Sequence, residues 1–186
     1  MTTQQPLRLT AETFISWAME QTQGRYELAG GEVVAMAAER AEHMRTKIAV
    51  FEALEAGLET GKTSCEVMLD GMAVRIDDVT VYEPDVLVRC GERTLGEAVS
   101  VSDPVVVVEV LSPSTAMLDS GVKLADYFRL ATLRHYLVVN THARSVTHHA
   151  RPGPQADIAT RILREGTLTL DPPGISVPVE AFFARL

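Results

Sequence analysis

The chain has 186 residues, of which 46% are hydrophobic, and its formal net charge of −8 disfavours avid, sequence-independent binding of nucleic acid. Its size and apolar content exclude global disorder and favour a single domain over residues 1–186, with residues 1–9 flexible. No apolar stretch approaches the roughly 20 residues that cross a bilayer and the N-terminus lacks an apolar signal core, so we expect a cytoplasmic protein without a membrane partner.

The first elements along the chain are a helix and a hairpin. Thr10 is suited to cap a helix that runs to about Gln21, where apolar residues recur at helical spacing. Gly30-Gly31 follows, and this dipeptide permits a positive φ at both turn positions of a tight hairpin. We therefore predict paired strands at residues 26–29 and 32–36.

An amphipathic helix and two strands are predicted next. Over residues 41–60 a single apolar stripe is formed by Met44, Ile48, Phe51, Leu54 and Leu58. Residues 65–76 and 79–89 have the composition of strands and are separated by two aspartates. The two cysteines, Cys65 and Cys90, are too few for a disulfide framework and lack the paired spacing of a zinc site, so we expect free thiols.

The C-terminal half begins with the most apolar run of the chain. Residues 105–111 read VVVVEVL and are predicted to form the central strand of the sheet. A helix at 116–131, a strand at 135–140 and a hairpin at 162–170 follow. Zinc-ligand spacing to a cysteine or carboxylate is lacking for His142, His148 and His149, which we expect at the surface. The predicted fold class is α/β of the mixed α+β kind, with helices packed on a mixed sheet.

Two carboxylates stand beside runs of apolar residues. Glu109 lies inside the run 105–111, where an ionised carboxylate is costly unless it is paired, protonated or bound to a metal. Asp85 follows Pro84, and a bend or bulge at that proline can re-aim its side chain. Carboxylates on neighbouring strands can converge to hold a hard cation. A structural ion pair for Glu109 and a turn role for Asp85 are the alternatives that the residues leave open.

A lysine on the following helix is the third candidate. Lys123 lies one residue before the core position Leu124, so its side chain can reach over the end of the central strand. A surface lysine that lays its alkyl chain along the helix is the alternative interpretation.

These residues stand in an order that resembles a known family. The segments YELAGGE, EHMR, EPDVLV, VVVVEVLSPST, LDSGVKLADYF and LVVN are similar to the Uma2 family, also known as DUF820, over roughly residues 10–183. EVLSPST followed by the D-x-G-x-K of Asp119, Gly121 and Lys123 is the most specific part of the resemblance. The resemblance implies the restriction-endonuclease-like PD-(D/E)xK nuclease fold, here with an N-terminal helix and hairpin.

The same resemblance implies roles for individual residues. The acidic pair of that fold corresponds here to Asp85 and Glu109, and these two, with the carbonyl of Val110 as a third ligand, are expected to bind metal. The lysine that the motif places two residues after the glutamate is Leu111 here, so we assign the cationic role to Lys123. The catalytic residues are thus predicted to be Asp85, Glu109 and Lys123.

Three further residues match the family and are auxiliary candidates. A two-residue turn at Gly30-Gly31 puts the side chains of Glu27 and Glu32 on one face of the hairpin, and one of them is expected to add a ligand. His43, at the start of the amphipathic helix, is expected to contact a phosphate or a water. A solvated hairpin face and a helix-capping histidine are the alternatives.

The sequence therefore predicts a Mg²⁺-dependent endonuclease, with Mn²⁺ as a substitute ion, that hydrolyses phosphodiester bonds of nucleic acid, DNA above RNA. Such a metal site supplies the positive charge that an acidic chain lacks. A homodimer is left open as the functional form. The alternative is a nuclease-fold protein that binds nucleic acid or a protein partner without cutting, with the acidic pair as a relic.

Overall fold

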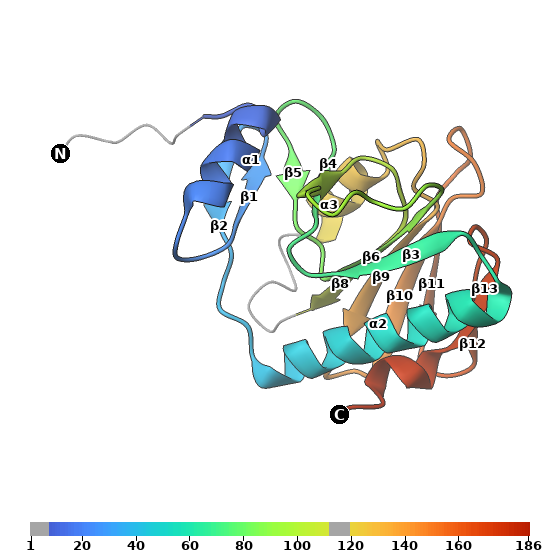
Figure 1. The fold of residues 1–186 in the computed structure, drawn as a ribbon. Coiled ribbons are helices and arrows are strands. Elements are labelled where there is room, and N and C mark those ends of the chain that lie inside the picture. The colour runs from blue at the N-terminus through green and yellow to red at the C-terminus, as the bar shows by residue number, and fades with distance from the viewer. Residues whose placement is uncertain (1–7, 112–119) are drawn as a thin grey trace.

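The computed structural model describes residues 8–111 and 120–186, which build a mixed α+β fold around two larger sheets (Figure 1). The expected flexibility of residues 1–7, and the part of the family motif at residues 112–119, lie outside the described residues. Two contacts connect the start of the described chain to the hairpin: Arg8 forms an isolated β-bridge with Glu32, and the Leu9 N–H donates to the Gly31 carbonyl at 2.8 Å.

The N-terminal helix and hairpin belong to a five-stranded sheet. Helix α1 (Ala11–Glu20) begins at Thr10, whose side-chain oxygen accepts from the Thr13 N–H at 3.3 Å, as the sequence predicts. The helix packs through Phe14 against Leu28 and Val81. The strands lie in the order β2 (Glu32–Ala35), β1 (Tyr26–Ala29), β5 (Val81–Tyr82), β4 (Ala73–Arg75) and β7 (Ser100–Val101).

A six-stranded sheet carries most of the core. Its strands lie in the order β11 (Ala159–Leu163), β10 (Ser145–Ala150), β9 (His135–Asn140), β8 (Pro104–Leu111), β6 (Val86–Cys90) and β3 (Cys65–Leu69). Only the β8–β9 pair is parallel, and all other pairs of this sheet are antiparallel. The run VVVVEVL lies inside the sheet, as predicted, because aliphatic residues cover both of its faces.

The two strands predicted between residues 65 and 89 are each divided in the structure. The first breaks at Asp70 and Gly71, whose φ values of 36° and 76° turn the chain, and the second breaks between β5 and β6. In both cases one half joins the five-stranded sheet and the other half joins the six-stranded sheet. Between β3 and β6 the chain therefore passes twice between the sheets, and the second of these passages contains Pro84 and Asp85.

One face of the six-stranded sheet is covered by the long helix α2 (Ala41–Gly61) together with the hairpin of β12 (Thr167–Leu170) and β13 (Ile175–Pro178) and the 3-10 helix η1 (Val179–Phe183) (Figure 1). The helix approaches β13 closely, since a Cβ atom added at Gly57 or Gly61 would lie 3.2 Å from side-chain carbons of Ile175. Its predicted apolar stripe is buried at Leu54 and Leu58 but not at the start of the helix, where Met44 is 50% exposed and Lys47 is 1% exposed. The reason is that Lys47 has carboxylate partners inside the molecule.

The opposite face packs against α3 (Ser120–Tyr127) and the five-stranded sheet, with tyrosines 82, 127 and 136 at its centre. Helix α3 ends four residues before the predicted boundary at residue 131.

The predicted hairpin at 162–170 is wrong, because β11 pairs with β10 and β12 pairs with β13. Nowhere in residues 8–111 or 120–186 does a helix combine the length and apolarity that crossing a membrane requires.

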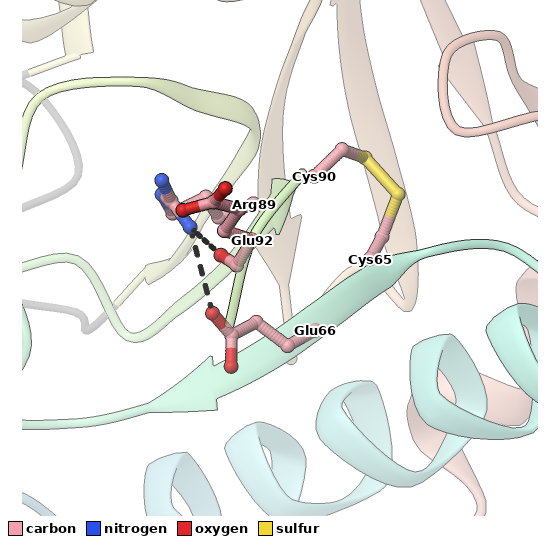
Figure 2. Close-up of a disulfide and its surroundings, with 5 residues drawn as sticks. All are labelled: Cys65, Glu66, Arg89, Cys90 and Glu92. Atoms are coloured by element: carbon pink, nitrogen blue, oxygen red, sulfur yellow. Dashed lines mark hydrogen bonds and ion pairs between the residues drawn. A yellow bond between two sulfur atoms is a disulfide. The ribbon is translucent and has the colours of Figure 1, made fainter. Parts of the chain in front are cut away.

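The expectation of free thiols is also wrong. Cys65 and Cys90 are directly paired across β3 and β6 and form a disulfide (Figure 2). The next pair in the same register is Glu66 and Arg89, whose charged groups lie 3.8 Å apart. The disulfide and this ion pair fasten β3, the edge strand, to the interior of the sheet.

A buried pair of histidines links β9 and β10. His135 Nδ1 and His148 Nε2 lie 2.9 Å apart, and each residue is less than 10% exposed, so His148 does not occupy the predicted surface position. His135 is paired with Ala150 and His148 with Leu137, so the two histidines are diagonal neighbours across the strand pair, and their ring centres lie 5.1 Å apart. Burial disfavours the imidazolium form and lowers the pKa of both residues to about 4.

Reduction of the disulfide is expected to destabilise the fold. The disulfide closes a loop with a sequence separation of 25, for which the loop-entropy relation gives about 3–4 kcal/mol. We expect dithiothreitol to lower the urea midpoint of the wild type and to leave the Cys65→Ser/Cys90→Ser double variant unchanged. Equal midpoints for the wild type with and without reductant would contradict this expectation.

The histidine pair predicts a loss of stability in mild acid. Between pH 6.5 and about 4 the unfolded histidines bind protons that the folded ones do not, so the free energy of unfolding falls as the pH falls through this range. The fall should be about 1–3 kcal/mol per histidine. Urea titrations between pH 7 and 5 should show a weaker fall for His148→Gln, and an unchanged fall for the exposed-histidine control His142→Gln. A steeper fall in His148→Gln would count against the assignment.

Candidate functional site

A cavity of about 220 Å³ lies where the two sheets meet. Strands β1 and β2, helices α2 and α3, strand β8 and the passage before β6 all contribute to its wall. The polar residues of the wall are Glu27, Glu39, His43, Asp85, Glu109, Lys123 and Tyr136. The junction of two sheets thus gathers charged side chains from five separate segments.

Asp85 lies in the floor of this cavity, one residue before β6. It is 6% exposed, and both of its carboxylate oxygens have partners. Oδ1 lies 2.9 Å from His43 Nε2, and Oδ2 accepts from the Val110 N–H at 2.6 Å. The break between β5 and β6 therefore aims the Asp85 side chain at β8, which is the re-aiming that Pro84 predicts.

Glu109 lies beside it on β8 and is the most strongly perturbed acid of the site. Its Oε1 accepts from Lys123 Nζ at 3.1 Å and from the Tyr127 hydroxyl at 3.0 Å. Burial, followed by the charges of Asp85 and Glu27, raises the pKa of Glu109, while Lys123 acts in the opposite direction. No hydrogen bond from the described residues ends on Oε2.

Lys123 joins Glu109 to the hairpin. Its ammonium donates to Glu27 Oε1 at 2.9 Å as well as to Glu109, and it lies 5.2 Å from the centre of the Tyr82 ring. Burial by itself lowers the pKa of Lys123, but the two carboxylates outweigh burial and raise it. Lys123 is therefore a permanent cation of the cavity and not a surface lysine.

Of the two hairpin glutamates only Glu27 belongs to the site. Its Oε1 also accepts from the Glu83 N–H at 3.0 Å, and the residue is 8% exposed. Glu32 lies outside the cavity and forms an ion pair with Arg8 at 3.1 Å, with 46% of its side chain exposed. The strand register is as predicted, but Glu32 pairs with Ala29 at the turn end of the hairpin, two pairs away from the Glu27–Val34 pair that lines the cavity.

Helix α2 contributes His43 and a residue that the sequence analysis missed, Lys47. Burial lowers the pKa of His43, but the hydrogen bond to Asp85 more than offsets this and raises it. One turn later, Lys47 Nζ lies 2.6 Å from Glu39, 2.5 Å from Asp70 and 3.8 Å from Asp85. The spacing of four between His43 and Lys47 places them along one side of the helix, and this is the signal that could have identified Lys47.

The structure brings Asp85, Glu109 and Lys123 to one cavity, together with Glu27, His43 and Val110, and leaves Glu32 outside. Their catalytic and metal-binding roles stay predictions. Two overlapping donor sets suit a cation. Asp85 and Glu109 offer carboxylate oxygens of the kind that Mg²⁺ prefers. Glu39, His43 and Asp85 have ligand atoms that all lie within 4.8 Å of one another.

Three comparisons place the molecule among known proteins. The Uma2 family model, described as "Putative restriction endonuclease", matches residues 11–180. The uncharacterized protein sll1609 of Synechocystis is 28% identical over 160 residues, which cover 84% of this chain and 89% of that protein. The uncharacterized protein slr1290 of the same organism is 25% identical over 180 residues, which cover 96% and 93%.

The fold likewise matches a solved structure. A crystal structure described as that of a putative nuclease belonging to DUF820 from Anabaena variabilis superposes with a TM-score of 0.74. The match covers 95% of this chain and 98% of that one at 11% identity, so it concerns the fold. The predicted restriction-endonuclease-like fold class is confirmed.

Removal of the Lys123 ammonium is expected to destabilise the site in a pH-dependent way. Lys123→Met leaves Glu27 and Glu109 without their shared cation, which should cost about 3 kcal/mol at pH 8.5. The loss should be smaller at pH 6, because the pKa of Glu109 rises further in the variant and a proton replaces the lost charge. Urea denaturation at both pH values measures this, with the exposed Lys62→Met as control. A loss of equal size at both pH values would show that Lys123 does not compensate these acids.

Proposed function

This chain belongs to the Uma2 family, and on that basis we propose that it is a Mg²⁺-dependent endonuclease that hydrolyses phosphodiester bonds of DNA, with Mn²⁺ able to replace Mg²⁺. One observation carries the proposal. Asp85, Glu109 and Lys123 are far apart in the sequence, come from a sheet junction, a strand and a helix, and line the same cavity. Two carboxylates that can hold a metal ion and a lysine cation at one place are what a cation-assisted attack on a phosphodiester requires.

The donor set at the cavity fits a hard divalent cation. Asp85 and Glu109 supply carboxylate oxygens from neighbouring strands, and the negative charges of Asp85 and Glu27 raise the pKa of Glu109 in the metal-free molecule. A bound Mg²⁺ would relieve that repulsion, lower the pKa of a water molecule and offset the charge of the scissile phosphate. Asp85 and Glu109 would hold the ion, with the Val110 carbonyl as the third ligand.

The protein's own groups have separate tasks in this proposal. Lys123 remains charged and stabilises negative charge that develops on the phosphate. The Tyr127 hydroxyl fixes the carboxylate of Glu109, and His43 with the Val110 N–H fixes that of Asp85, so that both ligands keep one orientation. Glu27 holds Lys123 from the hairpin side.

A second candidate function is favoured by the partners that the acids at the cavity already have within the chain. Each acid at the cavity already has a cationic or hydrogen-bonding partner within the chain: Lys123 for Glu27 and Glu109, and His43 for Asp85. A nuclease-fold protein that binds nucleic acid or a protein partner without cutting would need no metal to neutralise them. Calorimetric titration with Mg²⁺ separates the two functions, because a metal-dependent nuclease binds the ion and loses it in Glu109→Gln.

The proposed function is tested by cleavage of plasmid and linear DNA with Mg²⁺, with Mn²⁺ and with a chelator. Asp85→Asn keeps the size of the side chain but removes a charged ligand, and we expect it to lower the cleavage rate by about 100-fold or more. Glu27→Gln should also slow cleavage, since it loosens Lys123. Glu32→Gln is the matched control and should cleave at the wild-type rate, because Glu32 lies outside the cavity. Undiminished cleavage by Asp85→Asn would refute the assignment.

A further inference from the structure

Lys47 is the most deeply buried charged side chain among the described residues. It is 1% exposed, and its ammonium lies within 4 Å of carboxylates from three segments: Glu39 before α2, Asp70 after β3, and Asp85 before β6. A lysine is rarely enclosed in this way unless its charge is paired. The charge of Lys47 is therefore compensated inside the protein by these three carboxylates.

The Lys47 ammonium lies beside three side chains that could together hold a metal ion. Glu39, His43 and Asp85 offer ligand atoms within 4.8 Å of one another. Lys47 Nζ is a hydrogen-bonding neighbour of Glu39 and lies 3.8 Å from Asp85, which are two of these three residues. A divalent ion seated in this set would therefore lie next to a fixed positive charge.

We propose that Lys47 is a built-in cation that takes the place of a second metal ion beside Glu39 and Asp85, so that the site takes one divalent ion and not two. This inference rests on the proposed metal-dependent function, because the ion is the one held by Asp85 and Glu109. Lys47 acts through Asp85 and is a positioning residue. His43, in this arrangement, is a hydrogen-bonding partner of Asp85 and not a metal ligand.

The surrounding contacts explain why the ammonium stays in place. Arg25 bonds the same two carboxylates that Lys47 bonds, Glu39 at 2.8 Å and Asp70 at 3.1 Å, and it also bonds Glu83 at 2.7 Å. Glu39 and Asp70 are thus each shared between two permanent cations. They have less negative charge to offer a metal ion than Asp85 and Glu109 have.

The backbone ties the same groups together. The Asp70 N–H donates to the Asp85 carbonyl at 3.2 Å, so the residue that anchors Lys47 and the residue proposed to bind metal are neighbours on adjacent chain segments. Lys47 leaves α2 one turn after His43, and both point at Asp85 from the same side. Glu109 and Lys123 line the same cavity from β8 and α3.

The number of Mn²⁺ ions bound per chain tests the inference, with Mn²⁺ alone as the probe. Calorimetry on the wild type should give one ion, and its paramagnetic resonance spectrum should be that of isolated Mn²⁺ without coupling between two ions. Lys47→Met keeps an unbranched chain of similar length and removes the charge, so it should bind a second Mn²⁺. Lys47→Arg keeps the charge and should bind one, as should the exposed-lysine control Lys62→Met.

The outcomes separate this inference from the proposed function. Two coupled ions in the wild type, or one ion in a folded Lys47→Met, would overturn the built-in cation while leaving a metal-dependent nuclease intact. No ion in the wild type would refute the proposed function and, because the inference rests on that function, the built-in cation as well. The wild-type spectrum decides the matter if Lys47→Met does not fold, since coupled ions would contradict the inference and one isolated ion would support it.

Discussion

Compensation of buried carboxylates is the constraint on which the rest of this structure depends. Asp85 and Glu109 lie against aliphatic strands, where an unpaired charge would cost several kcal/mol. Two lysine cations lie beside these acids, Lys47 from α2 and Lys123 from α3, and His43 of α2 is a hydrogen-bonding partner of Asp85. Both helices therefore have to pack at one fixed position on the sheets, because a displaced helix would leave a buried carboxylate without its partner.

The second constraint is topological. The chain leaves one sheet and enters the other at Asp70 and again at Asp85, and these two passages lie side by side. At such a crossing the regular backbone ladder is interrupted, so N–H groups become available for other partners and side chains point in new directions. The cavity is thus a product of the way the strands are shared between two sheets, and Glu27 reaches it only because β1 belongs to the other sheet.

Local signals account for what the sequence could predict. Glu109 stands out because its neighbours are aliphatic, Asp85 because it follows Pro84, and Lys123 because its helical phase lies beside Leu124. Features that depend on distant partners escaped prediction. Lys47 reads as a solvent-facing helix residue until Asp70 and Asp85 are placed beside it, and its enclosure shifts the buried stripe of α2 away from Met44. The Cys65–Cys90 disulfide and the His135–His148 pair likewise follow from strand register, which a single sequence does not reveal.

Helix α2 connects the candidate site with the C-terminal hairpin. Its 21 residues span about 32 Å, with the candidate site at one end and the contact of Gly57 and Gly61 with Ile175 at the other. A methyl group at either glycine would lie 3.2 Å from side-chain carbons of Ile175, so this side chain would have to give way for a larger residue. The same helix thus meets two different demands: small residues where it touches the C-terminal hairpin, and charged residues where it borders the candidate site.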